Sequence, residues 1–442
     1  MARMDWTRLL SAERLGDKTY QANPNRSIFV QDHDRIVFSA PFRRLANKTQ
    51  VQPLYENDHV HHRLIHSIEV SSVGRSLAMR IGQWLVEKGE IEPARMHDLA
   101  DIIQAACVAH DIGNPPFGHS GEDAMGSWFA EHFATSRGPL SRLPPELQHQ
   151  FNAFEGNAQG FRILTRLEMY RGEGGMRLTK ATLGAFTKYP VTAADRIGLP
   201  KDYIGLKKFG VFQSDLSQFA EVAQGVGLIE KDRHWIRHPL VFLMEAADDI
   251  TYNIVDLEDA FTTGELTHDA VHQILITLGR PPSMTPLDMT QAEDIARLRA
   301  RTIGYAIDAC VEAFIANYDA IMDGTFSGDL VGASGLGAGF AEIRKLAKER
   351  IFTASRKTEL EVSGRRIIAN VLGGILPVYE EVAAKNWQAD DLSNRSRQLV
   401  RALSLDLRDV KDEQSALHAM ADFTSGMTDR YALRISRMLS GT

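Results

Sequence analysis

Cysteine is scarce in this sequence, and its scarcity excludes several kinds of protein. Two cysteines, Cys107 and Cys310, occur among 442 residues, and neither has another cysteine nearby in the sequence. Disulfide scaffolds and thiolate zinc sites need closely spaced cysteines, so both are excluded. Cys107 lies in the apolar run IIQAACVA, where we expect it to be a small core residue. The composition favours a reducing compartment, and we expect the cytoplasm.

Long apolar runs are also missing. No stretch approaches the roughly 18 unbroken apolar residues of a membrane-spanning helix. The first residues include Asp5, Arg8, Glu13 and Arg14, where a secretion signal needs an apolar run. We therefore expect neither a membrane span nor export.

An excess of positive charge is absent as well. The formal net charge is −7, whereas proteins that coat nucleic acid are usually basic. This balance is still compatible with a local basic pocket, which a polyphosphate ligand would need. With 44% hydrophobic and 24% charged residues, the composition is that of a globular protein able to bury a large core.

Alternating strand patterns are nearly absent, and helical periodicity dominates. We therefore predict an all-α fold, in which only Val51–Tyr55 is compatible with a short hairpin. Apolar residues spaced three and four apart predict helices near 63–87, 97–112, 119–134, 155–170, 213–226, 238–262, 267–278, 290–323, 340–354, 357–382, 389–405 and 413–438.

Three stretches interrupt the helical pattern. Residues 135–150 contain three prolines and predict a mobile flap or an exposed linker, and residues 171–212 predict irregular structure over a site. The glycine-rich residues 325–339 predict a boundary between residues 1–324 and a C-terminal helical region, residues 325–442. The GLGAG in this stretch is not a dinucleotide fingerprint, because no strand precedes it and its spacing is wrong.

Several side chains have the chemistry of a metal site. His110 and Asp111 follow an apolar helix, and Arg63 and His66 share one face of another. Further along, Asp248, Tyr252 and Asp256 form a stripe at i, i+4 and i+8 on an apolar helix. Buried carboxylates need partners, and a divalent ion bound by two histidines and two aspartates would provide one. Nitrogen and oxygen ligands suit Mn, Fe, Ni, Zn or Mg.

Spacing alone leaves other arrangements of the 15 histidines open, and a lone His-Asp pair more often has a structural role. The complete set of motifs resembles the bacterial dGTP triphosphohydrolases of the HD-domain superfamily. The motifs are Arg63-x-x-His66, His110-Asp111-x-Gly113-Asn-x-Pro116-Phe117-Gly118-His119 and Ala247-Asp248-Asp249-Ile-x-Tyr252, with Phe42–Leu45, Lys48–Val51, Phe154–Gln159 and Asp256–Asp259. The resemblance covers roughly residues 20–265 and does not reach the C-terminal third.

The resemblance implies an HD-domain helical bundle and assigns roles to individual residues. It implies a single divalent ion held by His66, His110, Asp111 and Asp248, with Asp249 as the competitor for the last position. It implies His119 and Glu122 as the catalytic pair. It implies substrate contacts from Gln50, Arg63, Lys208, Tyr252 and Asp256, with Lys188 and Lys207 as alternatives to Lys208. Asn114 stands where some relatives have another histidine, which leaves proton transfer to His119 and Glu122.

The implied reaction is hydrolysis of a dNTP, dGTP first among them, to a deoxynucleoside and inorganic triphosphate. The resemblance also implies a homo-oligomer, often a hexamer, and regulation by a nucleotide at a second site. Two alternatives stay open. One is another HD phosphohydrolase, such as a nucleotidase or phosphodiesterase, and the other is a regulatory protein that binds single-stranded nucleic acid.

Overall fold

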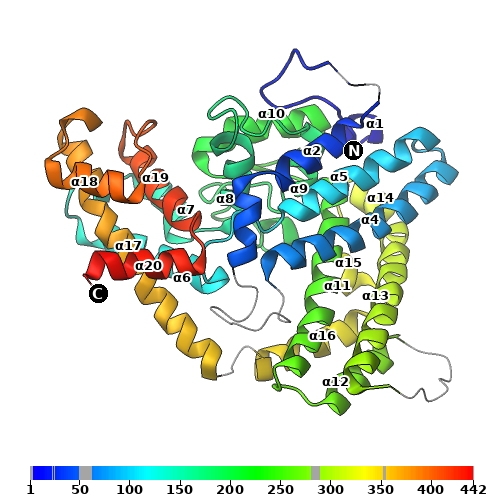
Figure 1. Ribbon diagram of the computed structural model, residues 1–442. Helices are drawn as coiled ribbons and strands as arrows, with labels where there is room; N and C mark the ends of the chain where they lie inside the picture. Colours follow the sequence, from blue (N-terminus) through cyan, green and yellow to red (C-terminus); the bar gives the residue numbers. More distant parts are fainter. Residues whose placement is uncertain are drawn as a thin grey trace.

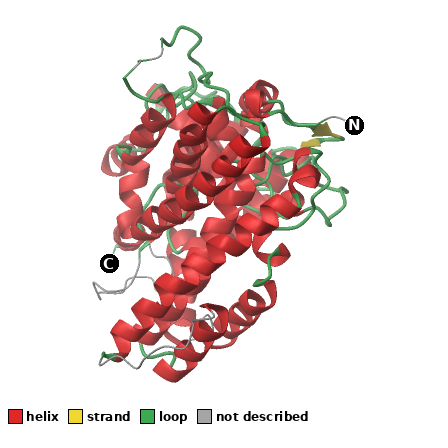
Figure 2. Ribbon diagram, turned by 90° about the vertical axis from the view of Figure 1, so that its right-hand side faces the viewer, coloured by secondary structure: helices red, strands yellow, loops and turns green. Residues whose placement is uncertain are grey.

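The computed structural model describes residues 3–21, 23, 25–48, 62–279, 289–351 and 355–441. Within these ranges helices predominate and are joined by loops (Figure 2). The strands β1 (Glu230–Lys231) and β2 (His234–Trp235) form one small antiparallel sheet. The prediction of an all-α fold is confirmed. Val51–Tyr55 lies outside the described residues.

Helices follow one another along the described chain (Figure 1). The α-helices are α1 (Trp6–Leu9), α2 (Ile28–Val37), α3 (Ala40–Arg44), α4 (Arg63–Lys88), α5 (Met96–Ala109), α6 (Gly118–Thr135), α7 (Pro145–Asn152), α8 (Gly156–Arg162), α9 (Lys180–Phe186), α10 (Leu216–Val226), α11 (Pro239–Thr262), α12 (His268–Gly279), α13 (Gln291–Ala316), α14 (Tyr318–Met322), α15 (Leu330–Ala333), α16 (Gly337–Leu346), α17 (Ser355–Ala384), α18 (Asn394–Leu403), α19 (Glu413–Ser425) and α20 (Asp429–Ser440). The short 3₁₀- and π-helical turns are η1 (Leu45–Asn47), η2 (Pro93–Arg95), η3 (Pro139–Arg142), η4 (Ile163–Leu167), η5 (Ile204–Leu206), η6 (Gln213–Asp215), η7 (Ala347–Ile351) and η8 (Ala389–Asp391).

Helix α5 lies at the centre of the first half of the fold. Its second half, IIQAACVA, is apolar on nearly every face, and a helix of that kind must be surrounded by other elements. Helices α2, α4, α9 and α11 pack against it. The His110–Asp111 pair, which follows α5 directly, therefore lies in the interior of the protein.

The buried apolar side chains form two cores. The first joins α4, α5, α11 and α13, and it also includes residues from Leu330 to Ile351. The second joins α6 and α7 to the C-terminal helices α17, α19 and α20, which lie side by side in Figure 1. The division of the chain into residues 1–324 and 325–442 stays a prediction.

Residues 135–150 differ from the expected flap or linker. They form η3 and most of α7, and Leu140 and Gln150 are buried. The prolines do not prevent helix formation, because Pro139 and Pro145 stand in the first turn, where no intrahelical hydrogen bond from the backbone nitrogen is needed. Residues 171–212 are largely irregular, as expected, apart from α9 and η5.

The structure differs from the predicted helices in two further ways. The helices α2 and α3 were not expected from periodicity, although Ser27 and Ser39 cap them through their side-chain oxygens. The helix expected over 413–438 is divided into α19 and α20 at Gly426 and Met427.

One segment of α17, Glu361–Ala384, is long and apolar enough to cross a membrane, and 44% of its most apolar window is buried inside the protein. Its side chains Ile368, Val371 and Leu372 belong to the second core, which accounts for their apolar character. The absence of a membrane span stays a prediction.

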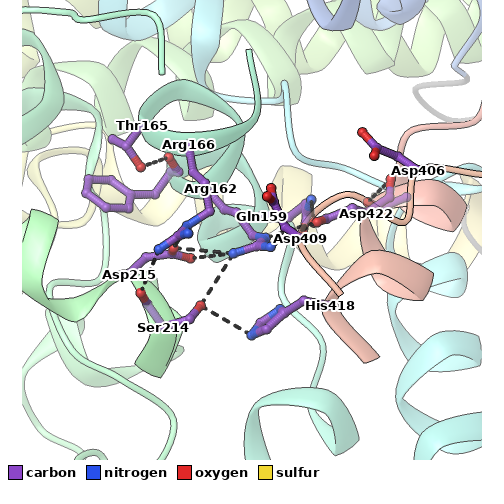
Figure 3. Close-up of polar contacts among 12 residues, drawn as sticks. Gln159, Arg162, Thr165, Arg166, Ser214, Asp215, Asp406, Asp409, His418 and Asp422 are labelled. Carbon is purple, nitrogen blue, oxygen red and sulfur yellow. Dashed lines mark hydrogen bonds and ion pairs between the residues drawn. The ribbon is translucent and has the colours of Figure 1, made fainter. Parts of the chain in front are cut away.

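Hydrogen bonds and ion pairs between charged and polar side chains join α19, one of the C-terminal helices, to α8 (Figure 3). The guanidinium of Arg162 donates to Asp422 of α19 from Nε at 2.9 Å and from Nη2 at 3.0 Å. Gln159 donates to the same carboxylate at 2.8 Å, and Arg162 also reaches the fully buried Asp215. Helix α19 is therefore held in one position against α8.

A second connection joins the C-terminal helices to the loop after α5. The buried Nζ of Lys48 donates to the carbonyl of Asn114 in that loop and to the carbonyl of Ser425 at the end of α19. The backbone N–H of Phe117 donates to Asp429 of α20 at 3.0 Å. Phe117 has a φ of 64°, a strained value for a residue with a side chain, and this hydrogen bond helps to hold it there.

We expect Asp422→Ala to lower the free energy of unfolding by about 3 kcal/mol, because it leaves Arg162 with an incompletely paired buried charge. Asp409→Ala is the control, since Asp409 is 63% exposed and pairs only at the surface with Arg171. Urea denaturation of both variants measures the difference. Equal destabilisation by the two substitutions would contradict the structural importance of Arg162–Asp422.

Lys48 should make stability depend on pH. Burial, Arg44 and Arg63 lower its pKa to about 7. The unfolded chain therefore binds more protons at this position between about pH 7 and the ordinary lysine pKa near 10.5, and stability rises with pH across that window. The slope from one proton is at most about 1.4 kcal/mol per pH unit.

Lys48→Met should remove this rise, whereas Lys385→Met, a change at an exposed lysine, should keep it. The measurement is the free energy of unfolding at pH 7, 8 and 9. A wild-type slope that persists in Lys48→Met would show that the rise has another source.

Candidate metal centre and active site

Three helices bring the predicted metal ligands to one place. Helix α4 supplies His66 from its first turn, the end of α5 supplies His110 and Asp111, and the middle of α11 supplies Asp248. Gly113 allows the loop after α5 to lie against α8, because a Cβ there would be 2.1 Å from the carbonyl oxygen of Gly156. His110 and Asp111 face His66 of α4, and His110 also faces Asp248 of α11.

The ligand atoms of these four residues lie close together. Those of His66, His110 and Asp111 are all within 4.8 Å of one another. The Nε2 atoms of His66 and His110 are 3.2 and 3.6 Å from Oδ1 of Asp248. Asp249 lines the same cavity, but Asp248 contacts both imidazoles, so the geometry favours Asp248 over Asp249. Their role as metal ligands stays a prediction.

The donor set fits a divalent ion. The Nδ1–H of His110 donates to the carbonyl of Cys107 at 2.7 Å, which points Nε2 toward the carboxylates. A backbone carbonyl commonly orients a metal-binding histidine in this way. Two imidazoles and two carboxylates, without thiolate, suit Zn, Fe, Ni, Mn or Mg.

The carboxylates are held in their ionised form. Burial raises the pKa of Asp248, but His110, His66 and Lys188 outweigh burial and hold that pKa well below its usual range. Burial likewise raises the pKa of Asp111, and Arg63 with the two histidines more than reverses the effect. Both groups are therefore negatively charged at neutral pH.

Arg63 and Asn114 fix the orientation of Asp111. Nη1 of Arg63 donates to Oδ2 and Nδ2 of Asn114 donates to Oδ1, both at 2.5 Å. Gly118 makes room for the guanidinium, because a Cβ at this position would be 2.6 Å from Nη2 of Arg63, and its φ of 57° also favours glycine. Arg63 therefore contacts the predicted metal ligand Asp111 and also lines the cavity.

The predicted catalytic pair is assembled at the edge of the cavity. Nδ1 of His119 is 2.6 Å from Oε2 of Glu122, and the imidazole is 82% exposed while Glu122 is 6% exposed. The N–H of Gly156 donates to Oε1 of Glu122 at 2.6 Å. Burial raises the pKa of Glu122, but His119, Lys208 and this N–H outweigh burial and lower it. An ionised, fixed carboxylate thus holds an accessible imidazole.

Lys208 lies beside this pair. Its Nζ is 2.9 Å from Glu155 and 3.7 Å from Glu122. Burial and the charge of Glu122 raise the pKa of Glu155 to about 7. Glu155 was not among the predicted site residues, although its segment, Phe154–Gln159, was among the motifs. Sequence spacing gave no sign that Glu155 and Lys208, 53 residues apart, form a pair.

The cavity has a volume of about 450 Å³ and contains several cationic groups. Its lining residues are Arg63, His66, His110, Asp111, Asn114, Phe117, Gly118, His119, Ser120, Asn157, Phe186, Lys188, Tyr189, Lys207, Lys208, Met244, Asp248, Asp249, Tyr252 and Glu361. Glu361 comes from α17, so the C-terminal region contributes to the wall. Nζ of Lys188 lies 3.5 Å from the carboxylate of Asp248, a predicted metal ligand, and 3.6 Å from that of Glu245.

The predicted sugar contacts are only partly brought together. Tyr252 lines the cavity one turn after Asp248. Asp256 is buried a further turn along α11, where it raises the pKa of Tyr252 in addition to the effect of burial, but it is not among the lining residues. Gln50 lies outside the described residues.

Comparison with known proteins identifies the family. The HD domain model matches residues 63–150, which include His66, His110, Asp111, His119 and Glu122. A deoxyguanosinetriphosphate triphosphohydrolase-like protein of Pseudomonas aeruginosa is 41% identical over 99% of both chains. One of the same description from a Synechocystis species is 37% identical over 99% of both chains. A deoxyguanosinetriphosphate triphosphohydrolase of Yersinia pseudotuberculosis is 30% identical over 98% of both chains.

These similarities extend through the C-terminal third, where the sequence motifs had given no guide. The resemblance to the dGTP triphosphohydrolases is thereby confirmed. The chain belongs to the deoxyguanosinetriphosphate triphosphohydrolase-like family of HD-domain proteins.

Proposed function

We propose that this protein is a metal-dependent triphosphohydrolase that converts a dNTP, dGTP among them, and water into a deoxynucleoside and inorganic triphosphate. The observation that carries the proposal is one cavity lined by the four predicted metal ligands, His119 and several cations, with Glu122 bonded to His119 at its edge. The names of the relatives from Pseudomonas and Yersinia support the same reaction class.

The reaction exchanges one bond at the α-phosphorus for another. The oxygen of water forms a bond to this phosphorus, and the bond from phosphorus to the 5′ oxygen breaks. A divalent ion held by the four ligands would supply a Lewis acid for an α-phosphoryl oxygen. Arg63 is in position to contact the same phosphoryl group. The products are the deoxynucleoside and inorganic triphosphate.

The departing 5′ oxygen requires a proton, which we assign to His119. Its Nδ1 faces Glu122, so the ionised carboxylate stabilises the imidazolium form and orients the ring. Glu122 is itself held by the N–H of Gly156 and does not need to change its protonation. The exposed position of the imidazole allows the other ring nitrogen to face a bound nucleotide.

Substrate selection rests on the remaining predicted contacts. Lys208, with Lys207 and Lys188 as alternatives, would neutralise the triphosphate. The Tyr252 ring, packed against C2′, would leave no space for a ribose hydroxyl. Gln50 and Asp256 would hydrogen-bond the 3′ hydroxyl, and an analogue lacking it would leave these groups unpaired. Four further properties stay predictions. They are a homo-oligomeric state, often hexameric in such proteins, regulation by a nucleotide, binding of single-stranded nucleic acid, and a cytoplasmic location.

The decisive test is a panel of the four dNTPs, four rNTPs and a cyclic dinucleotide with Mn²⁺ or Mg²⁺, in which inorganic triphosphate and pyrophosphate are measured directly, beside a binding assay with a single-stranded oligonucleotide. We expect triphosphate from at least one dNTP, little turnover of rNTPs, and none with His110→Ala. Release of pyrophosphate, or preference for a cyclic dinucleotide, would instead indicate another HD phosphohydrolase. Tight oligonucleotide binding with no hydrolysis would favour the nucleic-acid-binding alternative.

His119→Gln should lower kcat by about 10²- to 10⁴-fold and change KM little, because it removes the proton donor and leaves the metal ligands and phosphate contacts. Glu122→Gln should also lower kcat. The neighbouring exposed Asp123→Asn provides the control and should behave as wild type. Steady-state kinetics measure these effects, and a His119→Gln enzyme with normal kcat would refute the assignment.

A further inference from the structure

A second group of metal-binding side chains lies away from the cavity. His268 and His272 stand one turn apart on α12, and Asp294 faces them from the first turn of α13. Nε2 of His268 is 3.1 Å, and Nδ1 of His272 is 2.5 Å, from the same oxygen, Oδ2 of Asp294. Figure 1 shows α12 and α13 side by side.

Two of the three side chains contact further groups. Nδ1 of His268 lies 3.3 Å from the exposed carboxylate of Asp269, while its Nε2 faces Asp294. The other oxygen of Asp294 accepts a hydrogen bond from Arg297 at 3.0 Å. The first turn of α13 is further fixed by a capping box between Thr290 and Glu293.

The spacing is close to that of a coordinated ion. Metal–ligand bonds of 2.0–2.1 Å in a tetrahedral site separate the ligand atoms by about 3.3 Å. The His268–Asp294 distance of 3.1 Å is near that value, and the His272–Asp294 distance of 2.5 Å has to widen by about 0.8 Å. His272 is 32% exposed, so a side-chain rotation of this size meets little resistance and water can reach the site.

We propose that His268, His272 and Asp294 form a second divalent-metal site that fastens α12 to α13. Two imidazoles and one carboxylate select Zn²⁺, Ni²⁺ or Co²⁺ over Mg²⁺ and Ca²⁺, which prefer oxygen ligands. Water completes the coordination. None of the three residues lines the cavity that holds the proposed active site, so this metal stabilises the helix pair and does not take part in hydrolysis.

The first experiment counts bound metal in the full-length protein. Wild type, His272→Ala and the control His149→Ala, a change at an exposed histidine of α7, are stripped with EDTA, equilibrated with Zn²⁺ and analysed by elemental mass spectrometry. We expect His272→Ala to bind one equivalent per chain fewer than wild type, and His149→Ala to match wild type. Equal zinc content in His272→Ala and wild type overturns the proposal.

The second experiment removes the contribution of the active site. In a His110→Ala background, Zn²⁺ should still raise Tm, and adding His272→Ala should abolish that rise. Asp294→Asn keeps the size of the side chain and serves as a second variant should His272→Ala fold poorly. A zinc-dependent rise in Tm that survives both substitutions overturns the proposal.

Dependence of triphosphate release on His272 would also count against the proposal, because the metal is assigned no part in the reaction. With the metal of the active site supplied, His272→Ala should retain the turnover of wild type. This measurement distinguishes the two proposals. The proposed function is wrong if the wild-type protein releases no triphosphate, whereas the second metal site is judged by zinc content and Tm.

Discussion

The placement of two carboxylates largely away from water, Asp111 with 12% and Asp248 with 25% of the side chain exposed, is the constraint on which the rest of the site depends. An ionised carboxylate in an apolar interior is so unfavourable that it would normally become protonated. Here Arg63 and Asn114 surround Asp111, while His66, His110 and Lys188 surround Asp248. Arg63 and the two histidines lower the pKa of Asp111, and the histidines with Lys188 lower that of Asp248. The negative charge required of a cation site is thus maintained by the folded protein, through partners supplied by separate segments of the chain.

The same requirement explains why residues 63–150 do not form the site alone. Asp248 and Lys188 come from later segments, and the loop from Asn114 to Gly118 is held by Lys48 and Asp429 from outside that range. The left-handed backbone at Phe117 is unfavourable in isolation, and it persists because surrounding structure determines it. The C-terminal helices therefore support the loop that follows α5.

The sequence predicted the helical fold well because periodic apolar residues located α4, α5 and α11. The preference for Asp248 over Asp249 came from the resemblance, in which the aspartate stands four residues before Tyr252. The structure brings His66, His110, Asp111 and Asp248 together, and their role as metal ligands stays a prediction. Helices that depend on capping or on distant packing were missed. Ser27 and Ser39 cap α2 and α3, and α3 has only five residues. The prolines at the start of α7 suggested a loop. The Lys208–Glu155 pair forms because the irregular segment that contains Lys208 lies against the start of α8. Sequence periodicity does not indicate such a tertiary contact.

Arg63 connects the two halves of the proposed chemistry. Nη1 holds Asp111, while Nη2 lies beside Gly118 at the cavity. A guanidinium has five donors in a rigid plane, so one nitrogen can hold a ligand while another contacts a phosphate. A lysine at this position would offer a single point charge and could not fix both partners. Arg63 and His66, one turn apart on α4, would therefore set the α-phosphate at a fixed position relative to the metal ligands, and the absence of a Cβ at Gly118 is what permits the arrangement.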